Sequence, residues 1–217
     1  MERRWRARSG DIPVADPNAA SSHLSSETVG ATHAPPGNNR VRRVDGVTGI
    51  ITTYAGGGAS LGDGGPATQG QLLAPNDLVV DVQRNVYIAD TGNYRIRKVD
   101  GLTGVITTLA GNGIAGFTGD GGAATAARIG TAKGLAIDYA ANVYFSDVVN
   151  ASNHRVRLVS APGGLISTFA GAGPQGSAGD GGTAASANLN TPFGIVLDPG
   201  GRVQVTDKSN HRIRAVK

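Results

Sequence analysis

Arginine and aspartate recur together along the chain at spacings that could build either ion pairs or a phosphate-binding surface. Four Arg-x-Arg pairs, separated by 55, 60 and 57 residues, begin at Arg40, Arg95, Arg155 and Arg212. An aspartate precedes each of the last three pairs, at Asp90, Asp147 and Asp207. Both arginines of a pair lie on one face of a strand, because strand side chains alternate between faces.

Two interpretations of these charges are open. An ion pair within each repeat would make the aspartates and the first arginines structural. A ring of arginines would instead contact phosphates with salt-dependent affinity. Only five Tyr, four Phe and one Trp accompany the charge, whereas single-stranded nucleic acid usually stacks on aromatic side chains. We favour the ion pairs, and keep as candidate binding residues the second arginines and two histidines at equivalent positions: Arg97, Arg157, Arg214, His154 and His211.

A Gly-Asp-Gly-Gly sequence occurs three times and supplies one carboxylate per repeat, at Asp63, Asp120 and Asp180. Calcium takes about six to eight oxygen ligands, so these aspartates are weak metal candidates. The simpler interpretation is a turn whose glycines adopt positive φ while the aspartate accepts hydrogen bonds from nearby amides. Two histidines without a third ligand do not make a zinc site, and the absence of Cys removes thiolate ligands and a cysteine nucleophile.

Two segments, residues 111–116 and 171–176, match the dinucleotide-binding pattern GxGxxG. Such a site also needs a long crossover helix and a parallel strand. Here another glycine turn follows within three residues of the pattern, so we predict no nucleotide and no cofactor. With no GxSxG sequence either, we expect a chain without catalytic activity.

The residues that carry this chemistry lie on short runs rich in Val, Ile, Thr and Tyr and bounded by Gly, Asn and Asp, which predicts strands. Four such runs and one long glycine loop make a repeat unit, as in residues 76–122. Nearly continuous apolar runs at 78–82, 135–138 and 195–198 predict inner strands buried on both faces. Mixed apolar and hydroxyl runs beginning at 50, 105 and 165 suit outer strands, and the Ala-rich segments 67–72, 123–129 and 184–189 suit a helical turn.

Three of these runs together resemble NHL-repeat β-propellers: Leu-Ala-Ile-Asp at 135–138, Asn-Val-Tyr-Ile-Ala-Asp at 85–90 and Asn-His-Arg-Ile-Arg at 210–214. Gly-Asp-Gly-Gly followed by Pro-Ala-Thr or Ala-Ala-Thr is similar to the long-repeat subgroup of bacterial NHL and teneurin-like propellers. The resemblance covers residues 38–217. It implies a toroid of four-stranded blades, often six, that binds proteins, RNA or small molecules. Some similar propellers are lyases or lactonases with metal-bound side chains, but no matching ligand set can be placed here.

Residues 1–37 fit this pattern poorly. The segment 11–16 is a degraded copy of a first-blade strand, and residues 17–37, rich in Ser, Ala, Pro and Asn, predict a loop or disorder. The strands then run three, four, four and three, so we predict an all-β partial propeller of about three and a half to four blades. The chain is a truncated product, or four blades close imperfectly, or two chains combine as a homodimer.

Composition permits several partners without choosing one. The net charge of +4 and pI near 9.7 allow attraction to nucleic acid. The basic start has no apolar signal segment after it, and no run is long enough to span a membrane, so no compartment is assigned. We expect a protein-binding scaffold, with an RNA-binding propeller or a lyase or lactonase remnant as rivals. The expected binding loops are residues 56–65, 111–122, 148–152 and 171–182.

Overall fold

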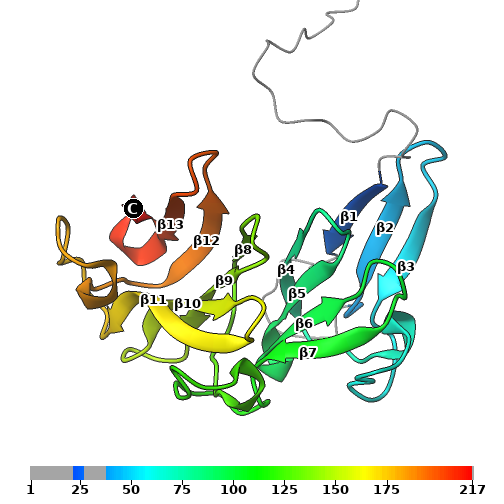
Figure 1. Cartoon of the computed structure of the whole chain (residues 1–217), viewed down its shortest axis with the longest axis horizontal. Coiled ribbons are helices and arrows are strands. Elements are labelled where there is room, and N and C mark those ends of the chain that lie inside the picture. The colour runs from blue at the N-terminus through cyan, green and yellow to red at the C-terminus, as the bar shows by residue number, and fades with distance from the viewer. Residues whose placement is uncertain (1–21, 27–37, 217) are drawn as a thin grey trace, which may run out of the picture.

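The protein is built from four antiparallel sheets that follow one another along the chain as blades (Figure 1). The computed structural model describes residues 22–26 and 38–216. Over these ranges the only helices are five 3₁₀ turns of three residues each. None of the helices in the described ranges is long and apolar enough to cross a membrane. The fold is an all-β partial propeller, as the repeats predict.

The sheets contain three, four, four and three strands. The first has the order β1 (Ser22–Ser26), β2 (Val41–Asp45) and β3 (Ile51–Ala55). The second has β4 (Pro75–Val80), β5 (Val86–Asp90), β6 (Arg95–Val99) and β7 (Ile106–Ala110). The third has β8 (Leu135–Ile137), β9 (Val143–Val148), β10 (His154–Ser160) and β11 (Leu165–Gly173). The fourth has β12 (Pro192–Leu197), β13 (Val203–Asp207) and β14 (Arg212–Val216).

The predicted outer strands and helical turns are confirmed. Each outer strand, β3, β7 or β11, lies at the edge of its sheet. Each Ala-rich segment contains a 3₁₀ turn after its glycine loop: η1 (Ala67–Gln69), η3 (Ala124–Ala126) and η4 (Ala184–Ser186). Two more turns, η2 (Thr91–Asn93) and η5 (Lys208–Asn210), connect the second and third strands of their sheets.

The first sheet differs from the expectation. Its first strand is β1, which lies inside the segment 17–37 that composition assigns to a loop. β1 pairs antiparallel with β2 from Ser22 opposite Asp45 to Ser26 opposite Val41. Backbone hydrogen bonds can define a strand whose sequence lacks an apolar alternation, so the pattern gave no signal. The predicted degraded copy at 11–16 lies outside the described residues.

The inner strands are less buried than their apolar sequences suggest. In β8, Leu135 and Ala136 are buried, because this strand contacts the inner strands on both sides, β4 and β12. In contrast, Val80 of β4 and Val196 of β12 are exposed. The expectation of burial on both faces therefore holds for Leu135 and Ala136 of β8 and is wrong for Val80 of β4 and Val196 of β12.

The core lies between successive sheets. The interface of the first two sheets buries Val41 and Ala55 of the first sheet against Val86 and Ile106 of the second. Ile106 and its repeat equivalent Ile166 have no exposed surface. Ile51 occupies the same repeat position in the first sheet but is 46% exposed, since no described sheet precedes it.

This difference predicts unequal costs for one substitution at two equivalent positions. Ile106→Ala should lower the free energy of unfolding by about 2–5 kcal/mol, because it leaves a cavity in a closed interface. Ile51→Ala should cost clearly less, since its side chain is already half in water. Urea denaturation measures both, and equal losses would show that the two positions are packed alike.

Candidate functional site

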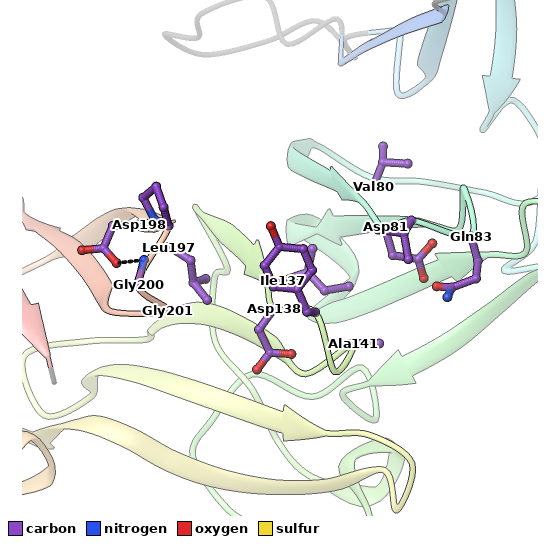
Figure 2. A pocket seen from close by; sticks show the side chains of 13 residues that line it. Val80, Asp81, Gln83, Ile137, Asp138, Ala141, Leu197, Asp198, Gly200 and Gly201 are labelled. Carbon is purple, nitrogen blue, oxygen red and sulfur yellow. Dashed lines mark hydrogen bonds between the residues drawn. The ribbon is translucent and has the colours of Figure 1, made fainter. Parts of the chain in front are cut away.

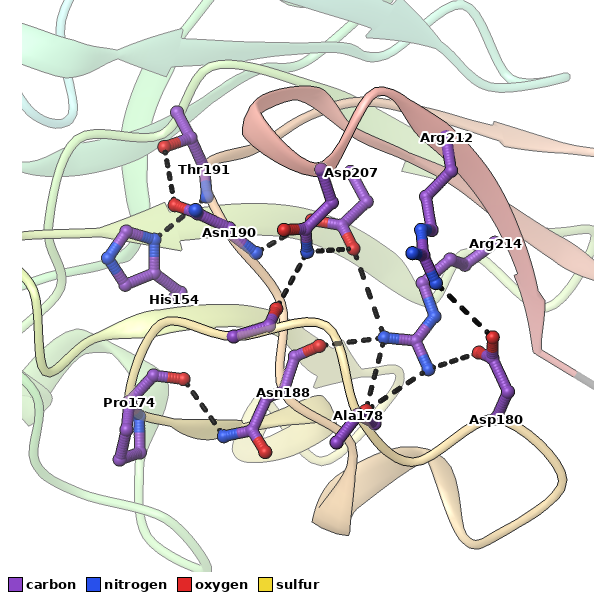
Figure 3. Close-up of polar contacts among 12 residues, drawn as sticks. His154, Pro174, Ala178, Asp180, Asn188, Asn190, Thr191, Asp207, Arg212 and Arg214 are labelled. Atoms are coloured by element: carbon purple, nitrogen blue, oxygen red, sulfur yellow. Dashed lines mark hydrogen bonds and ion pairs between the residues drawn. The ribbon is translucent and has the colours of Figure 1, made fainter.

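A buried carboxylate with the same partners recurs at the end of the second strand of three sheets. Asp207 accepts the amide of Asn190 at 2.6 Å and the Nδ2 group of Asn210 at 2.7 Å, and it faces Arg214 Nη1 at 3.8 Å (Figure 3). Asp147 has the same arrangement with Gly130, Asn153 and Arg157, and Asp90 has it with Leu73, Asn93 and Arg97. The amide donor lies just before the first strand of the same sheet, so the carboxylate ties the second strand to the segment that leads into the first strand.

The arginine in this network is the second of each Arg-x-Arg pair. Arg157 Nη1 lies 3.1 Å from Asp147 Oδ2, and its Nη2 lies 2.6 Å from Asp120 Oδ1. Asp120 belongs to the glycine loop that leaves the preceding sheet, so one guanidinium joins two sheets. Arg97 joins Asp90 to Asp63, and Arg214 joins Asp207 to Asp180, by the same geometry.

These contacts correct two expectations about the charges. The aspartates of the repeat do form ion pairs with arginine, but the partner of Asp90, Asp147 and Asp207 is the second arginine. The first arginines, Arg95, Arg155 and Arg212, do not pair with these aspartates. Arg97 and Arg157 have no exposed side-chain surface and therefore cannot contact a partner, while Arg214 is one-tenth exposed. Asp63 and Asp120 each accept a threonine hydroxyl as well, from Thr108 at 2.7 Å and Thr168 at 2.6 Å. Their oxygens are thus committed to the fold.

The first arginine of each pair binds a loop carbonyl. Arg95 Nη2 donates to Asn112 O at 2.9 Å, and Arg155 Nη2 donates to Ala172 O at 2.8 Å. The glycine after each carbonyl, Gly113 or Gly173, has positive φ, and a Cβ there would collide with the guanidinium. The two matches to GxGxxG therefore mark arginine-binding turns, and each leads through a further loop to a 3₁₀ turn. Arg212 remains partly exposed and lies 3.4 Å from Asp180.

Burial raises the pKa of Asp147, and the Gly130 amide and the Arg157 guanidinium act against it. Burial likewise raises the pKa of Asp90 against the Leu73 amide and Arg97. Both carboxylates thus depend on their donors to remain charged in the interior. The arrangement is that of a structural ion-pair network.

Loss of the central arginine should therefore be costly. Arg157→Met keeps most of the side-chain volume but leaves Asp147 buried without its counter-charge, and it should lower the free energy of unfolding by about 3–5 kcal/mol. Arg212→Met, at a partly exposed ion pair, should change it by less than about 1 kcal/mol. Chemical denaturation compares them. A loss for Arg157→Met no larger than that for Arg212→Met would contradict the structural assignment.

The two histidines have different surroundings despite their equivalent positions. His154 is buried, and its Nδ1 accepts the amide of Thr191 at 2.8 Å, which ties β10 to the segment before β12. Burial lowers the pKa of His154, while the charge of Asp207 acts against the shift. His211 is exposed and has a left-handed backbone conformation. No group of three potential metal-ligating side chains occurs in the described ranges.

The lowered pKa gives a pH dependence with a defined sign. A histidine in an unfolded chain has a pKa of about 6.5. Below that pH the unfolded chain binds a proton that folded His154 resists, so the free energy of unfolding should fall as the pH drops from 7 towards 5. His154→Gln should flatten this slope, and the control His211→Gln should keep it. Urea titrations at several pH values measure the slope, and a slope unchanged in His154→Gln would refute the assignment.

An open groove of about 560 Å³ lies where the inner strands end (Figure 2). It is formed by three equivalent turns, each of which follows an inner strand and leads to the second strand of the sheet. Two or three apolar residues from each repeat line it. We call it the hub groove, and it is lined by residues 80–83, 137–139, 141 and 197–201.

The carboxylates in the hub groove hold their own turns together. Asp81 accepts the amide and side-chain Nδ2 of Asn85 at 2.8 and 2.7 Å and the hydroxyl of Tyr87 at 3.1 Å. Burial, together with the charge of Asp81, raises the pKa of Tyr87 to about 12, so this phenol stays protonated and keeps donating. Asp138 has the same bonds with Asn142 and Tyr144. Asp198 accepts from Arg202, and these hydrogen bonds lower its pKa.

Sequence reasoning did not find the hub groove. Its signal is an apolar residue directly after the turn aspartate, which is Val82, Tyr139 or Pro199 in the three repeats. These residues differ in type, so the position does not stand out as a motif. The loops proposed from sequence as binding regions instead include those that carry Asp63, Asp120 and Asp180 and link the sheets.

Two segments match the NHL repeat family, residues 72–99 and 189–215. The chain therefore contains NHL repeats. The matched segments include the second and third strands of the second and fourth sheets, with Asp90, Arg97, Asp207 and Arg214. Two of the three buried ion pairs, Asp90 with Arg97 and Asp207 with Arg214, therefore lie within the matched repeats.

Proteins of similar sequence or similar structure match this chain over most of its length. The protein SUPPRESSOR OF QUENCHING 1 of Arabidopsis thaliana is 27% identical over 187 residues, which are 82% of this chain and 17% of that protein. A Bacteroides thetaiotaomicron protein of unknown function has a TM-score of 0.64 at 19% identity, covering 82% of this chain and 42% of its own. An auxiliary nutrient binding protein from Bacteroides ovatus has a TM-score of 0.63 at 21% identity, covering 83% and 43%. The chain thus spans less than half the length of each of these proteins.

Proposed function

We propose that this NHL-repeat chain is a non-catalytic scaffold that binds a protein partner through the hub groove. Two exposed apolar side chains carry this proposal: Tyr139 is 80% exposed and Val82 is 74% exposed, at equivalent turn tips. Contiguous apolar surface rimmed by polar groups is typical of interaction sites, and exposed tyrosines often anchor protein interfaces. The turns are held by internal hydrogen bonds, so the surface is preformed.

The chemistry of the hub groove favours binding over catalysis. A general acid or base needs a free proton acceptor or donor facing the substrate. The oxygens of Asp81, Asp138 and Asp198 instead accept hydrogen bonds from their own turns. What remains open to a ligand is chiefly the apolar surface of the three turns.

The arginine positions favour a protein partner over a nucleic acid. The predicted basic ring would require the second arginines at the surface, but Arg97 and Arg157 are buried in ion pairs. A basic net charge alone gives only weak, salt-dependent attraction to phosphates. The name of the Bacteroides ovatus neighbour, which describes a nutrient binding protein, is consistent with a binding role for this architecture.

A peptide library displayed on phage tests the proposal without a known partner. Selection on the purified chain should enrich peptides whose affinity falls at least about tenfold for Tyr139→Asp, because a buried anchor typically contributes more than 1.4 kcal/mol. Leu102→Asp is the matched control, since Leu102 is an exposed apolar residue at a turn tip outside the groove. It should bind like the unchanged chain.

Both variants should keep the unfolding midpoint, because surface substitutions usually change stability by less than about 0.5 kcal/mol. Filter binding with single-stranded RNA across salt concentrations tests the rival function. The proposal would be contradicted if the enriched peptides bound Tyr139→Asp as tightly as the unchanged chain. Tight retention of RNA at low salt that no peptide displaces would also contradict it.

A further inference from the structure

A cleft of about 300 Å³ lies between the second and third sheets. Its apolar walls include Tyr87 and Leu109 of the second sheet and Val143 and Val159 of the third. Tyr87, Val143 and Val159 are buried members of the core between these two sheets, so the cleft reaches that core. We call it the intersheet cleft.

Comparison of the repeats shows which side chain the second sheet lacks at this cleft. Each outer strand carries one larger residue after its two hydroxyl residues, and in the third sheet this residue is Phe169. Phe169 packs edge-on against Tyr144 of its own sheet, with the ring centres 4.9 Å apart. In the second sheet the equivalent residues are Leu109 and Tyr87, and both line the cleft. Leu109 brings no ring to Tyr87, so the place of a ring stays open.

A second difference between the same two sheets adds a positive charge. Lys98 lines the cleft and pairs with Tyr87 in the sheet, whereas the equivalent partner of Tyr144 is Leu158. The Lys98 ammonium lies 5.8 Å from the centre of the Tyr87 ring, and no ion pair of the described residues includes it. Asp81 is the other charged lining residue, but its oxygens accept hydrogen bonds within its own turn. Lys98 is therefore the charge available to a ligand.

We propose that the intersheet cleft binds a small aromatic carboxylate. The ring of the ligand takes the place that Phe169 has in the third sheet, and packs against Tyr87 and Leu109. The carboxylate pairs with the Lys98 ammonium. Ligand pockets typically combine an apolar lining with a few placed polar groups, and a volume of about 300 Å³ is at the lower end of their range, so the ligand is small.

This site can be tested separately from the hub groove. The two adjoin and share Asp81, Gln83 and Ala141. Neither Val82 nor Tyr139 lines the intersheet cleft, so a ligand bound there leaves the apolar turn tips of the hub groove exposed. The inference therefore does not rest on the proposed protein partner.

Phenylacetate is the probe, titrated into the isotopically labelled intact chain and followed by the amide chemical shifts in NMR spectra. We expect saturable binding with millimolar affinity, as is usual for a ligand with so few atoms. Phenylacetamide keeps the ring and the shape without the charge and should bind about fivefold more weakly. Acetate has the charge without the ring and should not bind measurably.

Two lysine replacements provide a matched comparison. Lys98→Met removes the charge that faces the carboxylate but keeps most of the side-chain length, and should weaken phenylacetate binding about fivefold. Lys208→Met is the control, because Lys208 also lies over an aromatic ring, 5.2 Å from the centre of Phe193, but does not line the cleft. It should leave the affinity unchanged.

A third variant fills the cleft. Leu109→Phe supplies the ring that the third sheet has, so it should abolish phenylacetate binding and keep or raise the unfolding midpoint. Absence of saturable binding, equal affinities for phenylacetate and phenylacetamide, or equal effects of the two lysine replacements would overturn the proposal. Unchanged binding by folded Leu109→Phe would overturn it as well. Should this variant fail to fold, the lysine comparison still decides the question, since Lys98 and Lys208 are not buried.

Discussion

The structure depends on neutralising a guanidinium that has been removed from water. Arg97 and Arg157 have no exposed side-chain surface, and each sits between an aspartate of its own sheet and an aspartate from the loop of the sheet before. An unpaired charge at such a depth would cost several kcal/mol, so the loop must bring its carboxylate to one place. The glycines that flank Asp63 and Asp120 adopt positive φ, which lets the backbone follow this path. Burial of the arginine charge therefore also fixes the conformation of the glycine loop.

This constraint also explains why the structural and exposed surfaces are separated. The second arginines and the loop aspartates form ion pairs between successive sheets, inside the protein. The turns after the inner strands are held by local bonds from Asp81, Asp138 and Asp198, which frees their tips to differ between repeats. A binding surface can therefore vary at Val82 and Tyr139 without disturbing the linkage between the sheets.

Much of the fold could be predicted from the sequence, because the same pattern of strands and glycine loops recurs several times along the chain. Strand type, the outer position of residues 106–110, and the short turns after the glycine loops all follow from local composition and periodicity. Which arginine of each Arg-x-Arg pair binds the aspartate could not be predicted. It depends on which loop lies beside which strand, and sequence spacing does not report that contact. Asp63 and Arg97 are 34 residues apart and meet only after two sheets have packed.

The surfaces were harder to predict than the fold for a similar reason. The hub groove forms where three turns converge, and its residues share a position but not a residue type. β1 was missed because its serine-rich sequence carries no alternation, although its backbone pairs with β2. In both cases the decisive information is a neighbour distant in the chain.

The direction of the inter-sheet linkage has a consequence for how such proteins can be divided and recombined. Each glycine loop is covalently part of one sheet but supplies the carboxylate and backbone partners of the next. The unit that keeps these contacts together is therefore not one sheet alone. It begins with a glycine loop, continues through the next sheet and ends with the outer strand of that sheet. A chimera joined just before an inner strand would place a glycine loop beside an arginine from the other parent protein. A chimera joined after an outer strand, as at Ala110, would keep each loop aspartate with its own arginine.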